Sequence, residues 1–210
     1  MDIVSQITRH SNLKDNDSLS CFQNNSAQQF HGAYQVFYDF LRDVKPVRIL
    51  EIGTALGGFT QFLKTACDDL RLNTNILSYD IASKDWYPDI IAKGIDLRVE
   101  NIFSPDYRSV KKDVVDFIMS DGVTIVLCDG GWKIGEFNLL SKYIKPGDYI
   151  LAHDYANTVE LFEKEINFKI WNWCEITEAD IELACEFNEL VPYKEDVFQS
   201  AAWVCKRKLT

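Results

Sequence analysis

Strand-like apolar runs alternate with helical segments along most of the chain, and this alternation restricts the fold more than any other feature. The run 47–53, VRILEIG, precedes a helical pattern at 57–67. Further strand-like runs follow at 74–81, 95–101, 123–131 and 149–156. Strands that alternate with helices favour an α/β fold with a mainly parallel sheet. The run 123–131 is almost wholly apolar up to Cys128, as expected of a strand that is buried on both faces.

Helices are expected between these strands and before the first one. Apolar residues at helical spacing predict a helix over 30–44, which Pro46 ends. The other predicted helices span 57–67, 84–94, 109–122, 136–148 and 158–168. Two final strands are predicted at 169–176 and 199–208, with an antiparallel pair as one arrangement, and the acidic stretch 175–196 is predicted as a solvated helix and loop. We therefore predict a seven-stranded, mainly parallel sheet with helices on both faces and an antiparallel last strand.

The length and composition fit one globular domain. The chain has 210 residues, 47% of them hydrophobic, and a net charge of -10. This length suits one core, which we place at residues 30–210, and we interpret the polar, irregular stretch 1–29 as an N-terminal arm or lid. An acidic chain is a poor non-specific binder of nucleic acid or of an anionic membrane.

The sequence also carries indications of the compartment. No apolar run approaches the roughly 20 residues that a membrane-spanning helix needs, and the first residues contain no apolar signal-peptide core. The six cysteines form no CxxC pair, which favours reduced thiols over a disulfide framework or a zinc site. We therefore expect a cytoplasmic protein.

Polar side chains close each predicted strand at its carboxyl end. In an open parallel sheet the ligand crevice lies at this edge, near the switch in strand order. The residues at the strand ends are Glu51, Gly53, Asp80, Asn101, Asp129, His153 and Asp154. Capping of the following helices is an alternative role for the aspartates, and the sequence leaves it open.

The glycine turn 53–58 indicates the kind of ligand. A dinucleotide fingerprint reads G-x-G-x-x-G, but Ala55 replaces the middle glycine here, and Glu51 stands two residues before the turn. A carboxylate at this position repels a pyrophosphate and can pair with a cationic amino group. Asp80, at the end of the neighbouring strand, can accept hydrogen bonds from two ribose hydroxyls. S-adenosylmethionine has both an amino-acid end and a nucleoside end, so it meets both requirements.

Three segments resemble class I S-adenosylmethionine-dependent methyltransferases. The segment 49–63, ILEIGTALGGFTQFL, looks like the first motif of that family, and SYD at 78–80 looks like its acidic second motif. The stretch 126–156 is similar to a branch that includes sugar O-methyltransferases and cephalosporin-hydroxylase-like proteins. The resemblance covers residues 30–156 and implies a Rossmann-like methyltransferase fold.

The resemblance also implies a set of cofactor-binding residues. Glu51 and Gly53 would hold the amino-acid end of the cofactor, and Asp80 would hold the ribose. Residues 101–103 would lie near the adenine ring, with the last two packed against it. The full cofactor-binding set that we predict is Glu51, Gly53, Thr54, Gly57, Gly58, Asp80, Asn101, Ile102, Phe103 and Asp129.

The sugar-methylating relatives bind magnesium with carboxylates at the ends of the fourth and fifth strands. By position, the resemblance implies Asp129, His153 and Asp154 as ligands of Mg²⁺ or another divalent metal. Such a metal would hold the acceptor hydroxyl and lower its pKa. Adjacent residues of a strand point to opposite faces, so His153 and Asp154 can share a site only if the strand has ended and turned.

The usual catalytic histidine of this branch is absent. In its D-G-D-H pattern the histidine stands three residues after the aspartate, where this chain has Trp132, and Gly131 replaces the residue before it. We predict His153 and Asp129 as catalytic residues, because the ordinary pKa of histidine suits proton abstraction near neutral pH.

These residues predict a methyltransferase that acts on a hydroxyl of a small molecule, with a sugar or polyol as a candidate and with metal assistance as an option. The missing histidine leaves a second hypothesis, a non-catalytic protein that binds S-adenosylmethionine. Ala55 and Glu51 oppose a third, a nicotinamide oxidoreductase. The expected partner is a small-molecule substrate. We expect neither nucleic acid nor a membrane as a partner, and the formation of a homodimer is left as an alternative.

Overall fold

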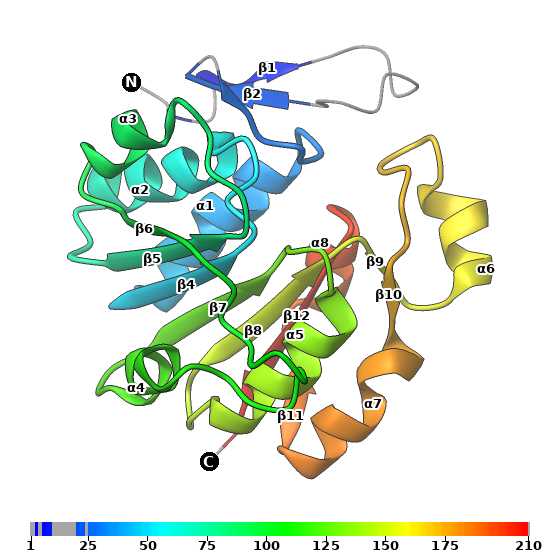
Figure 1. Cartoon of the computed structure of the whole chain (residues 1–210). Coiled ribbons are helices and arrows are strands. Elements are labelled where there is room, and N and C mark those ends of the chain that lie inside the picture. The colour runs from blue at the N-terminus through cyan, green and yellow to red at the C-terminus, as the bar shows by residue number, and fades with distance from the viewer. Residues whose placement is uncertain (1–2, 4–5, 10–19, 24, 210) are drawn as a thin grey trace.

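A seven-stranded sheet forms the centre of the molecule (Figure 1). The computed structural model describes residues 3, 6–9, 20–23 and 25–209. Across the sheet the strands lie in the order β11-β12-β8-β7-β4-β5-β6. Their bounds are β4 (Arg48–Ile52), β5 (Asn75–Asp80), β6 (Asp96–Val99), β7 (Thr124–Cys128), β8 (Tyr149–His153), β11 (Leu190–Pro192) and β12 (Trp203–Lys208). The first five predicted strands and the predicted last strand are therefore confirmed.

The strand directions place a switch in the middle of the sheet. β4 is parallel to β5 and β7, β5 is parallel to β6, and β7 is parallel to β8. β12 is antiparallel to β8, and β11 is antiparallel to β12. The chain runs outward from β4 to β6 and then returns to add β7 on the other side of β4. Open α/β sheets bind ligands at such a switch, beyond the carboxyl ends of the strands.

Helices cover both faces of the sheet, because successive strand residues point to opposite faces. On one face Ile49 and Ile125 pack with side chains of α1, α2, α3 and α8. On the other face Leu50 and Val126 pack with side chains of α4, α5 and α7. The helix bounds are α1 (Ala33–Val44), α2 (Gly58–Asp69), α3 (Tyr87–Ile91), α4 (Lys112–Met119), α5 (Lys133–Leu140), α7 (Glu178–Phe187) and α8 (Glu195–Gln199).

The prediction of a sheet strand at 169–176 is wrong. Only its last residue lies in a strand, β10 (Ile176–Thr177), which pairs with β9 (Tyr155–Ala156) in a separate two-stranded sheet. The backbone before it turns instead, and the N–H of Ile170 donates to the carbonyl of Ile166 at 2.8 Å. One edge of the large sheet is β11, which comes from the acidic stretch whose predicted form is a helix and a loop.

The helices predicted over 84–94 and 109–122 are shorter in the structure, at Tyr87–Ile91 and Lys112–Met119, and two others differ in form as well. Residues 158–168 form a short α6 (Val159–Leu161) that continues as a π-helical turn over Phe162–Ile166. The helix predicted over 136–148 begins earlier, at Lys133, and ends in a 3-10 turn over Ser141–Tyr143. The early start of α5 places Lys133 close to the end of β7.

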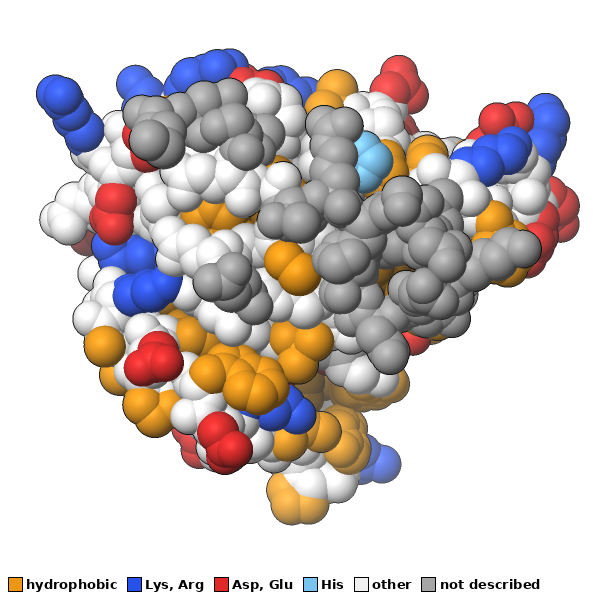
Figure 2. Space-filling model, turned by 90° about the horizontal axis from the view of Figure 1, so that it is seen from above, with side chains coloured by type: hydrophobic (Ala, Val, Ile, Leu, Met, Phe, Trp, Pro, Cys, Tyr) orange, Lys and Arg blue, Asp and Glu red, His pale blue; other side chains and the backbone are white. Residues whose placement is uncertain are grey.

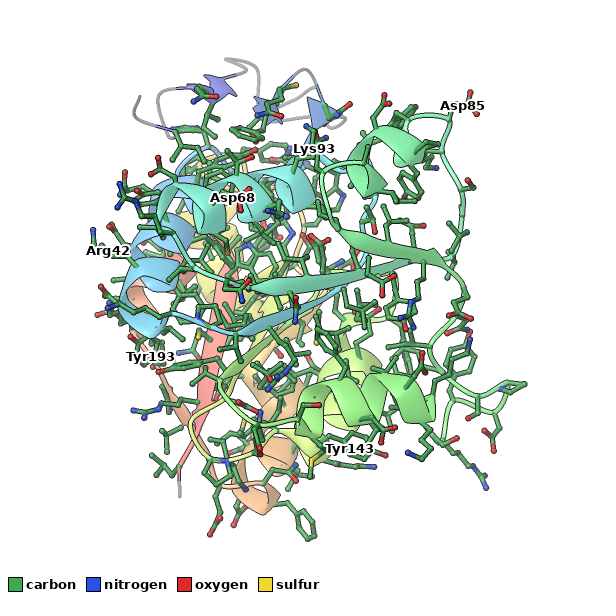
Figure 3. The ribbon with its side chains drawn as sticks, turned by 90° about the vertical axis from the view of Figure 1, so that its left-hand side faces the viewer. Arg42, Asp68, Asp85, Lys93, Tyr143 and Tyr193 are labelled. Atoms are coloured by element: carbon green, nitrogen blue, oxygen red, sulfur yellow. The ribbon has the colours of Figure 1, made fainter. Side chains whose placement is uncertain are left out.

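The segment before α1 packs across α2. Within its described residues it forms a small sheet of β1 (Thr8–Arg9), β2 (Ser20–Phe22) and β3 (Asn25–Ser26), and residues 1–2, 4–5, 10–19 and 24 of the predicted arm, 1–29, lie outside the described residues. Phe22 is buried against Phe62 of α2, with ring centroids 5.7 Å apart. In Figure 3 the labelled Lys93 lies below these strands, and its ammonium contacts the Gln23 side chain at 2.6 Å.

Charged side chains of both signs are interspersed over the face that Figure 2 shows, with hydrophobic side chains between them. Within the part of the chain that the structure describes, no helix is both long enough and apolar enough to cross a membrane. The expectation that nucleic acid is not a partner stays a prediction.

Gly58, the first residue of α2, lies against the backbone of β3. A Cβ at this position would lie 2.4 Å from the carbonyl oxygen of Asn25 and 2.6 Å from that of Ser26. We expect Gly58→Ala to lower the free energy of unfolding by about 1–3 kcal/mol, the usual cost of overpacking, although alanine is the better helix former. Chemical denaturation measures this difference.

Gly131→Ala is the matched control, because a Cβ there meets nothing within 4 Å and its φ is not positive. We expect its free energy of unfolding to equal that of the parent within experimental error. Unchanged stability of Gly58→Ala would contradict the packing of β3 against α2.

Candidate functional site

The ends of β4 and β7 are in contact at the switch point. The N–H of Asp129 donates to the carbonyl of Ile52 at 2.9 Å, which extends the strand pairing by one residue. Gly53 has a φ of +96°, and a Cβ there would lie 2.2 Å from the carbonyl oxygen of Asp129. Glycine is therefore required at position 53 both by conformation and by space. Two cavities lie against this contact.

The first cavity has a volume of about 350 Å³ and lies over the ends of β4, β5 and β6. Six predicted cofactor-binding residues line it, namely Gly53, Asp80, Asn101, Ile102, Phe103 and Asp129. The lining also includes Tyr107 and Trp132, whose ring centroids are 5.0 Å apart. Carboxylates together with aromatic walls suit a nucleoside, which has hydroxyl groups on one part and a flat ring on the other.

Asp80 also holds the glycine turn in place. Its Oδ2 accepts a hydrogen bond from the N–H of Ala55 at 2.7 Å, and its Oδ1 accepts from the N–H of Ala82 at 2.9 Å. Ala55, in the place of the middle glycine of the fingerprint, has a φ of +48°, a conformation that favours glycine. A carboxylate can accept further hydrogen bonds, so contact with a ribose is compatible with these two and stays a prediction.

A second cavity, of about 200 Å³, adjoins the first. Both cavities are lined by Gly53, Ala55 and Asp129. The further lining of the second cavity consists of Ala27, Gln28, Glu51, Thr54, Phe59, Lys133, His153, Asp154, Trp171 and Trp173. Because the cavities share three residues, molecules bound in them would be neighbours.

Glu51 is buried below the glycine turn. Its Oε2 accepts hydrogen bonds from the hydroxyls of Thr60 at 2.7 Å and Ser78 at 2.5 Å. Burial raises the pKa of Glu51 to about 7 in spite of these two bonds, and the charges of Asp129 and Asp80 act in the same direction. A cationic group bound beside Glu51 would favour its ionised form.

Gly57 and Gly58 do not line either cavity. Gly57 has a φ of +78°, and a Cβ there would lie 2.2 Å from the side chain of Ile90. Gly58 lies against β3. Packing therefore accounts for both glycines, and their predicted contact with the cofactor stays a prediction.

His153 and Asp154 meet in one site because the strand ends between them. β8 ends at His153, and Asp154 has a φ of +58°, which turns the chain. Nδ1 of His153 lies 3.1 Å from Oδ1 of Asp129 and 3.4 Å from Oδ1 of Asp154. Nε2 of Gln29, an amide donor, also lies 3.4 Å from Nδ1, but the two carboxylates are charged acceptors, so we assign the proton to Nδ1 and the lone pair to Nε2. The side chain is 2% exposed, and Nε2 has no hydrogen-bond partner among the described residues.

Lys133, which no motif in the sequence indicates, places a positive charge between these carboxylates. Its Nζ lies 2.7 Å from Oδ2 of Asp154, 2.9 Å from Oε2 of Glu175 and 3.7 Å from Oδ1 of Asp129. Burial acts to lower the pKa of Lys133, but the carboxylates outweigh it and hold this pKa above its ordinary value. Burial opposes ionisation of Asp154, yet His153 and Lys133 hold the pKa of Asp154 below its ordinary value.

Three further side chains, which no motif in the sequence indicates, hold the site together. Nε2 of Gln29 donates to Oδ2 of Asp129 at 2.8 Å, and Nε1 of Trp203 donates to Oε1 of Gln29 at 2.9 Å. The ring of His153 stacks on Trp203, with centroids 4.8 Å apart, and lies 4.6 Å from the ring of Trp171. Gln29 precedes Asp129 by 100 residues, so no local pattern could have linked them.

The predicted metal ligands converge, but a lysine shares their position. One ligand atom from each of Asp129, His153 and Asp154 lies within 4.8 Å of the others. The Lys133 ammonium contacts both carboxylates, and it would repel a divalent cation strongly in this buried setting. The arrangement therefore does not fit a metal ion while Lys133 holds its place, and metal binding stays a prediction that no observation supports directly.

Known proteins share this fold. Residues 25–175 match the FtsJ-like methyltransferase family. The apo structure of CmcI is similar, with a TM-score of 0.64 at 10% sequence identity, over 92% of this chain and 77% of that chain. A CmcI structure with magnesium and S-adenosylmethionine has a TM-score of 0.58 at 12% identity, over 89% of this chain and 75% of that chain.

A Staphylococcus aureus protein described as a caffeoyl-CoA O-methyltransferase has a TM-score of 0.54 at 11% identity, over 83% of this chain and 82% of that chain. At such identities these structures show a shared fold alone. A search of curated protein sequences finds no match.

The fold and the family match together define the class of protein. The chain has a Rossmann-like methyltransferase fold and is an S-adenosylmethionine-dependent methyltransferase, as the glycine turn and its resemblance predicted. The family match spans more than half of the chain, including the glycine turn and the ends of β4, β5, β7 and β8. The chain therefore belongs to the FtsJ-like methyltransferase family.

The raised pKa of Glu51 makes the stability of the ligand-free protein depend on pH. Its pKa is about 7 in the folded protein against an ordinary value of 4.5, so the folded state binds this proton more tightly. The contribution to stability is complete below the ordinary value and is lost as the pH rises through about 7. We expect Glu51→Gln to remove up to about 3 kcal/mol of that loss, measured by denaturant unfolding below and above this range.

Glu160→Gln, at an exposed position in α6, is the control and should leave the pH dependence of unfolding unchanged. If Glu51→Gln shows the same pH dependence as the parent, burial does not shift the pKa of Glu51 as described.

Asp80 is the residue whose change should affect cofactor affinity most directly. Hydrogen bonds to a charged group contribute about 1.5–3 kcal/mol each, so we expect Asp80→Ala to weaken S-adenosylmethionine binding by about 10- to 100-fold in isothermal titration. Asp85→Ala is the control, because Asp85 lies at the outer edge of the molecule in Figure 3. Undiminished affinity in a folded Asp80→Ala variant would refute the ribose contact.

Proposed function

We propose that this methyltransferase transfers a methyl group from S-adenosylmethionine to a hydroxyl group of a small molecule. The observation that carries this proposal is the pair of adjoining cavities with His153 in the second one. We name the first the cofactor cavity and the second the acceptor cavity. The description of the Staphylococcus aureus neighbour as an O-methyltransferase agrees with this acceptor type.

S-adenosylmethionine, when bound, supplies a methyl group on a positively charged sulfur. In the cofactor cavity Asp80 would accept hydrogen bonds from the ribose, and residues 101–103 would contact the adenine. The amino-acid end would lie toward Gly53 and Glu51, which line the acceptor side. The carboxylates of Glu51 and Asp129 give this region a negative charge that suits the cationic end of the cofactor.

His153 would act as the general base. The Nε2 lone pair takes the proton of the acceptor hydroxyl while the hydroxyl oxygen forms its bond to the methyl carbon and the bond from that carbon to sulfur breaks. Asp129, 3.1 Å from Nδ1, holds the ring in the required tautomer and stabilises the imidazolium that forms. The proton then passes from Nε2 to water when the methylated product leaves. The protein would also accelerate the reaction by aligning the two reactants, one on each side of Gly53 and Asp129.

The walls of the acceptor cavity suit a compact, hydroxylated molecule. Its volume of about 200 Å³ is small. Trp171 and Trp173, with ring centroids 5.0 Å apart, provide flat apolar surfaces, while Lys133 and Asp154 provide charged polar groups. A sugar or a polyol presents both C–H faces and hydroxyls, so these are the acceptors that we propose.

His153→Asn tests the general base separately from the contact with Asp129 that orients it. Asparagine keeps an N–H group that can donate to Asp129 and removes the basic Nε2. We expect kcat to fall by about 10²- to 10⁴-fold, the contribution of general-base catalysis. The assay follows S-adenosylhomocysteine formation with a panel of sugars and polyols, and isothermal titration should show cofactor affinity unchanged.

His31→Asn, in the turn before α1, is the control and should keep the parent kcat. A His153→Asn variant with the parent kcat would refute the role of the base. Cofactor binding by the parent without turnover of any acceptor would favour the alternative that Trp132 suggested, a binding protein without catalysis, and no cofactor binding by the folded parent would refute the whole proposal.

A further inference from the structure

We infer that the ammonium group of Lys133 takes the place of a divalent cation in the acceptor cavity, so that this enzyme binds no metal there. The inference rests on the acceptor cavity of the proposed function but not on the identity of the acceptor. It concerns a position where the resemblance implied a metal and where the structure instead holds a buried lysine.

The surroundings of Lys133 are those of a hard cation. Its Nζ lies 2.7 Å from Oδ2 of Asp154, 2.9 Å from Oε2 of Glu175 and 2.9 Å from the carbonyl oxygen of Gly130, with Oδ1 of Asp129 at 3.7 Å. All four of these contacting atoms are oxygens, and three of them belong to carboxylates. Mg²⁺ and Ca²⁺ prefer such oxygen ligands in proteins. The side chain of Lys133 is 7% exposed, so the ammonium has exchanged water for these oxygens.

The backbone commits Lys133 to this position. Lys133 is the first residue of α5, and the loop between it and β7 is held by Glu136, whose carboxylate accepts from the N–H groups of Gly130 at 3.1 Å and Trp132 at 3.2 Å. Glu136 is itself 2% exposed. To move the ammonium away, either the loop must lose its hydrogen bonds to Glu136 or the Lys133 side chain must leave its buried position.

The carboxylate oxygens that a metal would need are already in use. Of the two oxygens of Asp129, Oδ1 contacts His153 at 3.1 Å and Oδ2 accepts from Gln29 at 2.8 Å. Of the two oxygens of Asp154, Oδ1 accepts from the indole N–H of Trp171 and Oδ2 contacts Lys133. A metal at this position would compete with these partners for the same oxygens and would also lie against a positive charge.

The arrangement keeps a function that a metal would have served. Lys133 lines the acceptor cavity beside His153. Its three N–H groups face Asp154, Glu175 and Gly130, so its positive charge, and not a further hydrogen bond, would favour the acceptor oxygen as that oxygen loses its proton. The cation that orients the acceptor is thus part of the chain. Methyl transfer by this enzyme should accordingly be insensitive to chelators.

Mn²⁺ binding tests the inference directly. Mn²⁺ is added to the chelator-treated full chain and followed by electron paramagnetic resonance and by the shift in thermal unfolding temperature. We expect no binding by the parent and by Lys142→Ala, the control at an exposed lysine. We expect Lys133→Ala, which leaves the oxygens without their cation, to bind Mn²⁺ at least about tenfold more tightly than the weakest binding that the measurement would detect in the parent. We expect Lys133→Ala/Asp154→Asn to lose that gain.

Mn²⁺ binding by the parent that Asp154→Asn removes would overturn the inference, and this arm does not depend on whether Lys133→Ala folds. A folded Lys133→Ala that binds no Mn²⁺ would overturn it as well, because the oxygens would then not form a cation site. Circular dichroism and a cooperative thermal unfolding transition check that each variant is folded. These readouts measure the metal alone, so a failure of the proposed methylation reaction is recognised separately, as absence of cofactor binding or turnover in the parent.

Discussion

The contact between Gly53 and the backbone of Asp129 is the constraint on which the site depends. It joins the ends of β4 and β7 where the strand order switches, and a Cβ at position 53 would lie 2.2 Å from the Asp129 carbonyl oxygen. Because the two strand ends are held together, the Asp129 side chain lies between the cofactor cavity and the acceptor cavity and lines both. One carboxylate can therefore face the cationic end of the cofactor and also orient His153.

The charges around Asp129 form one balanced network. Buried charges are costly unless they are paired and hydrogen-bonded. Asp154, at 8% side-chain exposure, is paired with Lys133, at 7%, and Glu175 lies 2.9 Å from the same ammonium at the more exposed side. Gln29 adds a neutral donor to Asp129. The N-terminal segment is therefore part of the site, because without Gln29 one oxygen of this half-buried carboxylate would lose its partner.

The sequence was sufficient where a property repeats along the chain or stands at a fixed place in it. Strand periodicity identified β4 to β8, and polar residues at strand ends identified Asp80, Asp129 and His153. It was insufficient where a contact joins distant segments, as for Gln29 and Lys133, whose partners are set by the fold. The aromatic stretch 169–176 has the composition of a strand, yet Trp171 is buried against His153 in a turn. Composition cannot separate these two ways of burying aromatic rings.

The replacement of a histidine by Trp132 does not by itself imply a loss of activity. Trp132 packs against Phe103 and Tyr107 and lines the cofactor cavity, so this position now serves the cofactor side of the site. In the reaction that we propose, His153 at the end of β8 supplies the base instead, and Lys133 at the start of α5 supplies the cation. Asp129 contacts both His153 and Lys133. Contacts with the lysine and the histidine therefore give an aspartate at this position a role without a metal, and its presence is no argument for a metal.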